Sequence, residues 1–264
     1  MSPEVARNRA AYDRMARDGH RLCRPATAAE LADPMSVVDR WGWLDRDLRG
    51  RRVLCLAAGG GRHGPLYAAA GAEVTVADIS PEMLRSDREE GQRHGLSIRT
   101  VETSMDDLAD FTDGEFDVVI HPVSTCYVAD PRPVFAEVAR VTRAGGAYIS
   151  QHKTPVSLQV AADADADGGY RVRTPLVPKH PAEPPTAGPN ADRLREPGAV
   201  EFAHRWDEIV GGICRAGFVV EDLVHPDHTG DDDPAFARRA RYFPPYVRIK
   251  ARRGMESSHR LWVG

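Results

Sequence analysis

The sequence predicts an α/β fold built around a mostly parallel β-sheet, and three observations carry that prediction. From Arg52 onward, short apolar runs alternate with polar-faced helical segments, which is the pattern of strands joined by crossover helices. The first apolar run, 52–57, leads directly into the glycine cluster at 59–61. The second run, 73–78, ends in the acidic residue Asp78. This order predicts a ligand site at the carboxyl ends of the first two strands.

The individual strands are predicted from short runs of β-branched and other apolar residues bounded by glycine, proline or charged residues. Runs of this kind recur between the crossover segments, and two more follow a polar stretch in the middle of the chain. The predicted strands are 52–57, 73–78, 97–101, 116–121, 146–152, 218–224 and 246–251.

Three helices of the core have clear boundary signals. Ser80 followed by Pro81 is a capping hydroxyl before a first-turn proline, and Gly95 is expected to end that helix. A second helix over 131–143 carries valines on one face and stops before a Gly-Gly pair. A third helix is expected over 202–216, where a glycine again follows it.

Composition divides the chain further. The first part is helical in character but carries few bulky apolar side chains. The stretch 154–200 combines an alternating Ala-Asp run with many prolines, so it cannot bury enough apolar surface to be a domain and is predicted to be an inserted lid or loop. The predicted organisation is an N-terminal helical lid at 1–49, a core at 50–153, the inserted lid at 154–200 and a C-terminal part of the core at 201–264.

Charge and cysteine usage narrow the class of partners. The formal net charge of −4 over 264 residues argues against phosphate backbones as the main partner. The four cysteines are far apart and form no C-x-x-C pair, which indicates reduced thiols and a cytosol. No apolar run reaches the length of a membrane span, and the N-terminus has no apolar signal core. We expect a cytoplasmic protein that binds neither nucleic acid nor membrane; a homodimer is left open.

Two acidic stretches imitate metal sites without meeting their spacing. Asp163, Asp165 and Asp167 alternate as at the start of a calcium loop, but the twelfth position is Thr174 rather than glutamate. The loop at 225–233 contains histidines and aspartates with no zinc spacing. Both stretches are predicted to be solvated loops, and no metal is expected.

The glycine cluster and Asp78 together form a nucleoside-cofactor motif. The glycines let the backbone pass close to a ligand, the following helix supplies free N–H groups, and the carboxylate accepts both hydroxyls of a ribose. The spacing Gly59-x-Gly61-x-x-Gly64 also satisfies the dinucleotide fingerprint. This motif alone therefore leaves an NAD enzyme and a methyltransferase open.

The residues around the motif resemble the class I S-adenosylmethionine-dependent methyltransferases. Residues 53–61 read Val-Leu-Cys-Leu-Ala-Ala-Gly-Gly-Gly in place of the common V-L-D-L-G-C-G-x-G. Cys55 stands where an acid is usual, and Ala57 replaces the first glycine. The resemblance continues through three further motifs: Asp-Ile-Ser-Pro-Glu-Met-Leu at 78–84, Ser-Met-Asp-Asp-Leu at 104–108 and the Arg-x-Gly-Gly turn at 143–146. A narrower likeness lies near the C-terminus, where Glu-Phe-Ala-His-Arg-Trp at 201–206 is similar to bacterial small-molecule members of the family.

The resemblance implies a Rossmann-like, seven-stranded, mostly parallel sheet with an antiparallel last strand, and S-adenosylmethionine as the cofactor. By the same resemblance, Gly59 and Gly61 hold the methionine part, Asp78 the ribose hydroxyls and Asp106 the adenine amino group. Tyr12 corresponds to the aromatic position that closes over the cofactor. The full set of implied cofactor residues is Tyr12, Ala57, Gly59, Gly61, Asp78, Ile79, Met83, Met105, Asp106 and His121.

Methyl transfer from a sulfonium is an in-line displacement, which needs positioning, exclusion of water and an available lone pair rather than a metal. Histidines suit the removal of the acceptor's proton at neutral pH, so His152 at the end of the fifth strand and His204 before the helix after the lid are the predicted catalytic residues. The expected acceptor is a small molecule, an aromatic or heteroaromatic natural-product intermediate, because aromatic side chains offer stacking surfaces: Trp41, Trp43, Tyr127 and Tyr170.

Other classes of protein stay open beside this one. Tyr246 and Lys250 fit the Tyr-x-x-x-Lys of short-chain dehydrogenases, but they lie in a strand-like run. A nucleic-acid amino-methyltransferase carries Asn/Asp-Pro-Pro-Tyr after the fourth strand, where this chain has His-Pro-Val-Ser at 121–124. A relative that binds the cofactor without transferring its methyl group is the remaining alternative.

Overall fold

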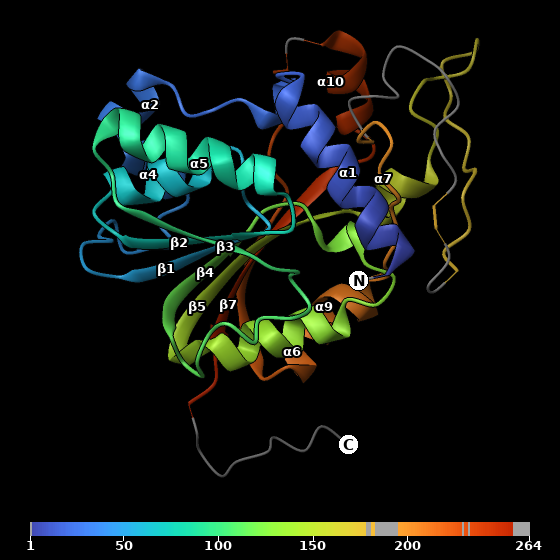
Figure 1. The fold of residues 1–264 in the computed structure, drawn as a ribbon. Helices are drawn as coiled ribbons and strands as arrows, with labels where there is room; N and C mark the ends of the chain where they lie inside the picture. Colours follow the sequence, from blue (N-terminus) through green and yellow to red (C-terminus); the bar gives the residue numbers. More distant parts are fainter. Residues whose placement is uncertain (1, 178–180, 183–194, 229, 232, 256–264) are drawn as a thin grey trace.

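One seven-stranded sheet organises the molecule (Figure 1). The computed structural model describes residues 2–177, 181–182, 195–228, 230–231 and 233–255. The strands follow the order β3-β2-β1-β4-β5-β7-β6, and β7 runs antiparallel to both β5 and β6 while the other pairs are parallel. The predicted fold class is confirmed. The strands are β1 Arg52–Leu56, β2 Glu73–Asp78, β3 Ile98–Glu102, β4 Phe116–His121, β5 Thr142–Lys153, β6 Phe218–Val224 and β7 Tyr246–Arg253.

Helices cover both faces of the sheet, with α4 and α5 on one side and α6 and α9 on the other (Figure 1). The helix α1 lies beside the carboxyl ends of the strands. The helices are α1 Pro3–Arg17, α2 Ala28–Ala32, α3 Pro34–Val38, α4 His63–Ala69, α5 Pro81–His94, α6 Arg132–Val141, α7 Pro155–Gln159, α9 Trp206–Arg215 and α10 Pro234–Ala240, with short 3-10 turns η1 Arg21–Cys23 and η2 Thr125–Tyr127.

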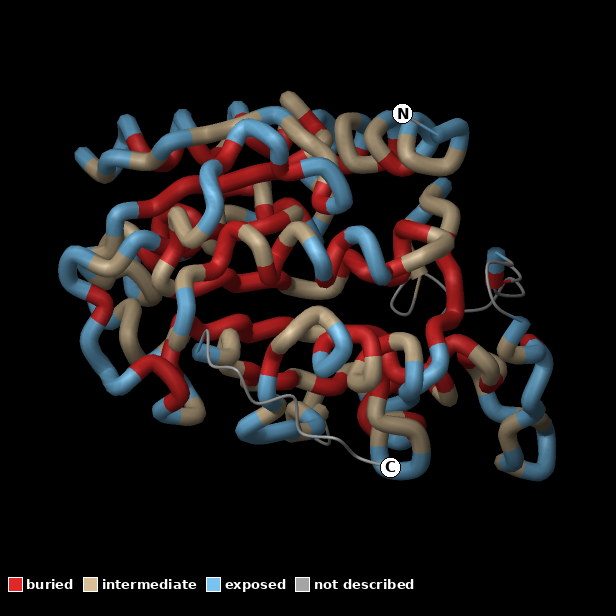
Figure 2. Tube along the Cα trace, turned by 90° about the horizontal axis from the view of Figure 1, so that it is seen from below, coloured by how far each residue is buried: buried red, intermediate tan, exposed pale blue. Residues whose placement is uncertain are grey.

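Strand β1 shows why the sequence produces two cores. Its alternating side chains point to opposite faces of the sheet. Leu54 and Leu56 pack into the cluster that contains Phe135 of α6. Val53 and Cys55 pack into the other cluster, on the side of α4 and α5. Both faces of the strand are therefore buried, as a parallel strand in the middle of such a sheet requires, and Figure 2 shows this burial along the central strands.

Two element boundaries differ by four residues from the sequence prediction, and the others differ by less. The helix expected over 202–216 begins at Trp206, because Phe202 is extended: it pairs with Pro181 and its backbone N–H donates to the Cys126 carbonyl at 2.7 Å. Strand β5 begins at Thr142, earlier than expected, because Thr142 pairs with β4 across a register shift.

The described first part of the inserted segment is anchored to α10 by Arg239. This side chain is 1% exposed, and its guanidinium donates to the carbonyls of Ser157, Val160 and Ala161. The Ala-Asp run forms a tight turn closed by the Arg171–Asp165 ion pair at 2.7 Å. The start of the segment, 155–162, is therefore packed against α10, whereas much of 163–177 is exposed. Residues 178–180 and 183–194 lie outside the described residues. Closure of this segment over a ligand stays a prediction.

Candidate active site

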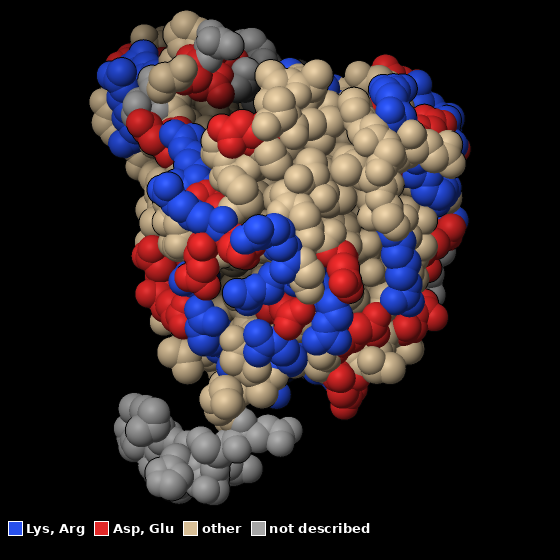
Figure 3. All heavy atoms as spheres, turned by 90° about the vertical axis from the view of Figure 1, so that its left-hand side faces the viewer, with Lys and Arg blue, Asp and Glu red and all other residues tan. Residues whose placement is uncertain are grey.

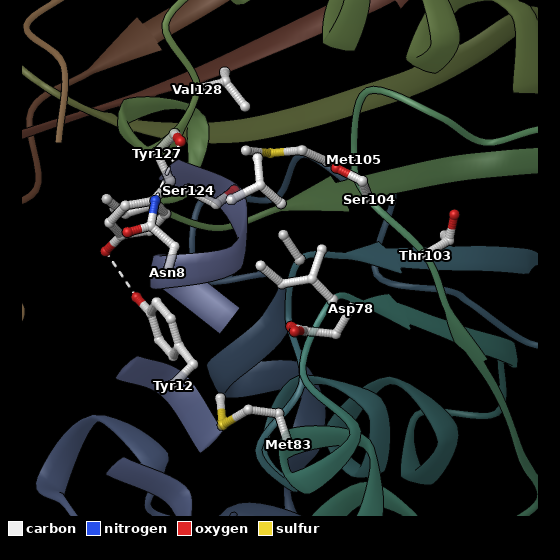
Figure 4. A pocket seen from close by; sticks show the side chains of 14 residues that line it. Asn8, Tyr12, Asp78, Met83, Thr103, Ser104, Met105, Ser124, Tyr127 and Val128 are labelled. Atoms are coloured by element: carbon white, nitrogen blue, oxygen red, sulfur yellow. Dashed lines mark hydrogen bonds between the residues drawn. The ribbon is translucent and has the colours of Figure 1, made fainter. Parts of the chain in front are cut away.

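A pocket opens at the carboxyl ends of β1 and β2 and runs beneath α1 (Figure 4). It encloses about 580 Å³ of space, part of which is open to solvent. Its walls come from segments far apart in the sequence, which the sheet and α1 bring together. Six residues predicted from the sequence line it, namely Tyr12, Ala57, Asp78, Ile79, Met83 and Met105.

The glycine turn forms the wall behind this pocket. Ala57 has φ +47°, a left-handed conformation in which glycine would be unstrained, and Gly60 and Gly61 have φ +113° and +74°. A Cβ at Gly59 would come within 2.8 Å of the Met83 Cβ. Gly59 and Gly61 do not line the pocket themselves, so their predicted contacts with a ligand stay a prediction.

Asp78 presents its carboxylate to the pocket from the end of β2. Oδ2 accepts a hydrogen bond from the Gly59 N–H at 3.0 Å, and Oδ1 accepts one from the Ser80 N–H at 2.9 Å. Burial raises the pKa of Asp78 to about 6, and the nearby charge of Asp13 acts in the same direction. The Ile79 N–H also contacts this carboxylate. The carboxylate oxygens keep acceptor capacity on the side that faces the pocket, where they can accept from hydroxyl groups of a ligand.

A second hollow continues from this pocket along the ends of β2 and β3. The two share Val5, Ile79 and Ser104 in their walls, and the predicted residue Asp106 lines the second one. Asp106 is exposed and accepts a hydrogen bond from the Ser104 hydroxyl. An ion pair between Arg9 of α1 and Glu102 of β3, 2.6 Å long, lies beside this hollow. The junction of the two hollows thus combines the apolar side chains of Val5 and Ile79 with the hydroxyl groups of Thr103 and Ser104.

The three predicted histidines lie in one buried network below η2 rather than in the pocket wall. His121 contacts the Tyr148 hydroxyl at 2.8 Å and the Ser124 hydroxyl at 2.6 Å. His152 uses its two ring nitrogens for Thr125 and Ser150, at 2.7 and 2.8 Å. His204 reaches the Thr125 carbonyl through Nε2 at 3.0 Å. Burial lowers the pKa of all three, that of His121 to about 3, so the rings are neutral at pH 7. Any catalytic part of His152 or His204 stays a prediction.

Eight of the fourteen pocket residues were not predicted as cofactor or catalytic residues, and Tyr127, Asn8 and Ser124 are among them. The Tyr12 hydroxyl contacts the Tyr127 hydroxyl at 2.7 Å, drawn as a dashed line in Figure 4. Asn8 and Ser124 line the pocket beside this pair. Asn8 precedes Tyr12 by four residues on α1, so the two share a helix face, and that spacing was a usable signal. Ser124 carried no signal, because only the fold around η2 brings this residue to the pocket wall.

A buried ion cluster lies behind Tyr127, at the end of β5. The Lys153 ammonium contacts Glu196 at 2.6 Å and Glu201 at 2.9 Å, and Arg195 pairs with Glu201 at 3.0 Å. Burial alone would lower the pKa of Lys153, but the two carboxylates outweigh it and raise that pKa. Glu196 also accepts a hydrogen bond from Tyr127. The cluster thus connects the end of the inserted segment, through Arg195 and Glu196, with the pocket wall.

Comparisons with known proteins agree with this geometry. A family model described as a methyltransferase domain matches residues 54–150. An uncharacterized methyltransferase of Bacillus subtilis, YbaJ, is 40% identical over 174 residues, which is 66% of this chain and 68% of that protein. The chain belongs to the class I S-adenosylmethionine-dependent methyltransferases.

Two further relatives fit the same assignment. A ubiquinone biosynthesis O-methyltransferase of Xanthomonas oryzae is 32% identical over 117 residues. The aligned residues make up 44% of this chain and 49% of that protein. An S-adenosylmethionine-dependent methyltransferase from Mesorhizobium loti shares the fold with a TM-score of 0.63 at 21% identity, over 83% of this chain and 100% of that one. The methyltransferase therefore uses S-adenosylmethionine as its cofactor, as predicted.

The structure also bears on the predicted stacking residues, metal sites and membrane spans. Of the four aromatic residues predicted for stacking, only Tyr127 lines the pocket among the described residues, since Trp43 is bound to Asp222 and Tyr170 packs on Phe243. Among the same residues, no group of acidic, histidine or cysteine side chains is arranged to hold a metal, positions 229 and 232 of the 225–233 loop lying outside them. No described helix combines the length and apolarity that a bilayer crossing requires.

Proposed function

We propose that the methyltransferase transfers the methyl group of S-adenosylmethionine to a small molecule that enters the pocket beneath α1. The observation that carries the proposal is the position of the Asp78 carboxylate. It is buried at the end of β2, held by the N–H groups of Gly59 and Ser80, and still faces the pocket with remaining acceptor capacity. A ribose bound there would extend toward the apolar walls on one side and α1 on the other.

The residues of the pocket divide among the parts of the cofactor. Ala57, Gly59 and Gly61 would hold the methionine part, and Met83 packs under the turn. Ile79 and Met105 would contact the adenine faces, with Asp106 at the amino group. Tyr12 would cover the cofactor from α1, and His121 would support the wall near the sulfonium. The bound cofactor supplies an electrophilic methyl group, while these residues fix its orientation and exclude water.

Proton removal from the acceptor is the remaining chemical task. Tyr127 borders the pocket and donates a hydrogen bond to Glu196. As an acceptor hydroxyl loses its proton to the Tyr127 oxygen, Tyr127 would pass its own proton to Glu196, and the proton would come to rest on Glu201, which shares a hydrogen bond with Glu196. Burial raises the pKa of Glu201 to about 7, whereas at Glu196 the charge of Lys153 outweighs burial and lowers the pKa. This route reaches the pocket directly, which supports it over the predicted bases. His152 and His204 hold η2 in place and reach an acceptor only through Thr125 and its neighbours.

The class of acceptor follows from the pocket and one relative. The walls are apolar around a few hydroxyl and amide groups, and two tyrosines offer aromatic faces for stacking. The similar protein from Xanthomonas oryzae is a ubiquinone biosynthesis O-methyltransferase. On the face shown in Figure 3, basic and acidic side chains are intermingled, and the chain carries a net charge of −4. We therefore propose an aromatic or heteroaromatic metabolite as acceptor, rather than a nucleic acid, in the cytoplasm.

Methyl-labelled S-adenosylmethionine tests this proposal. The protein is incubated with it and with a bacterial extract separated into small molecules, protein and nucleic acid. At a cofactor concentration near the dissociation constant, label should move into the small-molecule fraction with the unaltered protein and far more slowly with Asp78→Ala. Label in the protein or nucleic-acid fraction would overturn the acceptor class. Tight cofactor binding without transfer to any fraction would instead indicate the relative that binds the cofactor without methylating.

A further inference from the structure

The glycine turn rests on α5 through a buried carboxyl group that does not line the pocket. Asp87 has no exposed surface, and its Oδ2 accepts a hydrogen bond from the Gly60 N–H at 2.9 Å. The same N–H also contacts the Met83 carbonyl at 3.1 Å, one helical turn before Asp87. Two groups of α5 therefore hold a single N–H of the turn.

The surroundings of Asp87 show that this carboxyl group serves the turn. Among the described residues, the hydrogen bonds that reach it come from Gly60 and Gly61. Its Oδ1 has no hydrogen-bond partner in the described part of the chain. A Cβ at Gly64 would approach that oxygen to 2.9 Å, so the start of α4 is packed against it. A carboxyl group is costly to bury, and here the compensation comes from the turn.

Strand β1 lacks the acid that the family motif usually carries beneath the glycine turn. Cys55 stands in the motif where an acid is usual, and its thiol is completely buried. Cys55 pairs with Val76 of β2. A Cβ at Gly64 would meet both the Val76 side chain and Asp87 Oδ1, at 2.7 and 2.9 Å. Burial, and next the charge of Asp87, raises the pKa of the Cys55 thiol. Cys55 packs on the α4 and α5 side of the sheet, the side from which Asp87 approaches. An acid at position 55 would bring a carboxylate beneath the same turn.

We propose that Asp87 is a positioning residue for the cofactor turn and supplies from α5 the carboxylate that related methyltransferases carry on β1. By fixing the N–H groups of Gly60 and Gly61, Asp87 keeps the turn against α5. Ala57 and Gly59 then hold the wall of the pocket in the shape that Asp78 completes. This inference rests on the proposed place of the cofactor beside that turn.

Calorimetry with S-adenosylhomocysteine tests the role without any acceptor. Asp87→Ala should weaken binding about fivefold to tenfold, because the Gly60 N–H keeps only the Met83 carbonyl. Asp87→Asn should bind within about twofold of the unaltered protein, since its amide oxygen still accepts from Gly60. Adding Cys55→Asp to Asp87→Ala should restore most of the lost affinity. Glu89→Ala, an exposed carboxylate on the same helix, is the matched control and should change nothing.

The outcomes separate this inference from the cofactor assignment. Asp87→Ala binding within twofold of the unaltered protein, or a double variant no tighter than Asp87→Ala, would overturn the positioning role. If the double variant proves unfolded by circular dichroism, the difference between the Ala and Asn variants decides. Asp78→Ala is measured alongside. Unchanged affinity in that variant would show that the cofactor lies elsewhere, which is a failure of the proposed function and not of the Asp87 contact.

Discussion

Two buried carboxyl groups, Asp78 and Asp87, flank the glycine turn and have different tasks. Asp78 lines the pocket and keeps acceptor sites for a ligand, whereas Asp87 is enclosed and bound to the turn alone. Burial raises the pKa of both, to about 6 and about 7. Each therefore releases its proton near neutral pH, and folding stability must depend on pH there.

We predict that, as pH rises, the free energy of unfolding of Asp87→Asn increases relative to that of the unaltered protein. Because the folded pKa of Asp87 is above its unfolded value, the unaltered protein loses stability between about pH 4 and pH 7, and the asparagine does not. The charges near it are Asp78 of β2 and Arg88 of its own helix, with the Cys55 thiol on β1.

Urea titrations measure this difference in the free energy of unfolding. The Asn variant should gain roughly 2–4 kcal/mol relative to the unaltered protein between pH 4 and pH 8. A difference that stays constant with pH would show that Asp87 titrates normally.

Tyr127→Phe tests the proposed proton route once an acceptor is found. Removing the hydroxyl interrupts the path to Glu196, so kcat should fall about a hundredfold while S-adenosylhomocysteine affinity stays unchanged. Tyr242→Phe, at an exposed tyrosine, serves as the control. If His152→Asn lowers kcat about a hundredfold and Tyr127→Phe leaves kcat unchanged, His152 is the base, as the sequence indicated, and the Tyr127 route is wrong.

Among the secondary-structure elements, α1 decides whether the pocket is closed. Asn8 fastens it: the side-chain amide donates to the carbonyls of Tyr127 and Val200, and its oxygen accepts from the Val200 N–H at 2.7 Å. The helix is also joined to α5, where the Ser80 hydroxyl donates to Asp13 at 2.6 Å. The Asn8 side chain thus joins α1 to η2, through Tyr127, and to the end of the inserted segment, through Val200.

Asn8→Ala should lower the free energy of unfolding by about 1–3 kcal/mol, because it leaves buried backbone groups of Val200 and Tyr127 without partners. Hydrogen exchange should quicken in 3–17 and 195–202 while the central strands stay protected. Equal exchange in both proteins would mean that Asn8 does not hold the helix.

The lid hypothesis has its own exchange experiment. Bound S-adenosylhomocysteine and acceptor should slow exchange in 8–24 and in the described part of 154–200. Helix α1 lines the site, and the end of the inserted segment contacts α1 and Tyr127 from behind the pocket wall. Deleting Asp163–Asp167 should alter acceptor affinity and turnover far more than cofactor affinity, because Asp78 and the glycine turn lie on the sheet. Unchanged exchange in both segments would contradict closure.

Local signals explain which elements could be predicted from the sequence. Strand β2 and helix α5 follow from an apolar run, the Ser80-Pro81 start and the left-handed Gly95 that ends the helix. The start of α9 was misplaced, because Phe202 pairs with Pro181 and Cys126, contacts between distant segments. The pocket lining at Ser124 depends on the fold of η2 in the same way. The sequence was therefore sufficient to predict the motif residues on the sheet, but not the contacts between segments that are distant along the chain.

For the molecule as a whole, the cofactor half and the acceptor half are separable. The sheet, α4 and α5 hold the glycine turn and Asp78, whereas in the proposed function α1, η2 and residues 195–202 form the acceptor side around Tyr127. A chelator should leave methyl transfer unchanged, because positioning and the Tyr127 route need no metal. Loss of turnover with chelator and its return with magnesium or zinc would make the 225–233 loop a catalytic site.

Binding of S-adenosylhomocysteine to the unaltered protein and to Asp78→Ala is the most direct test of the central claim, that the pocket beneath α1 is the cofactor site. Calorimetry should give micromolar affinity, about −8 kcal/mol, for the unaltered protein. Asp78→Ala should lose about 1–3 kcal/mol, because two ribose hydroxyls lose their acceptor. NAD should give no heat with either protein. Equal affinity of the two proteins for S-adenosylhomocysteine, or tight binding of NAD instead, would contradict the account.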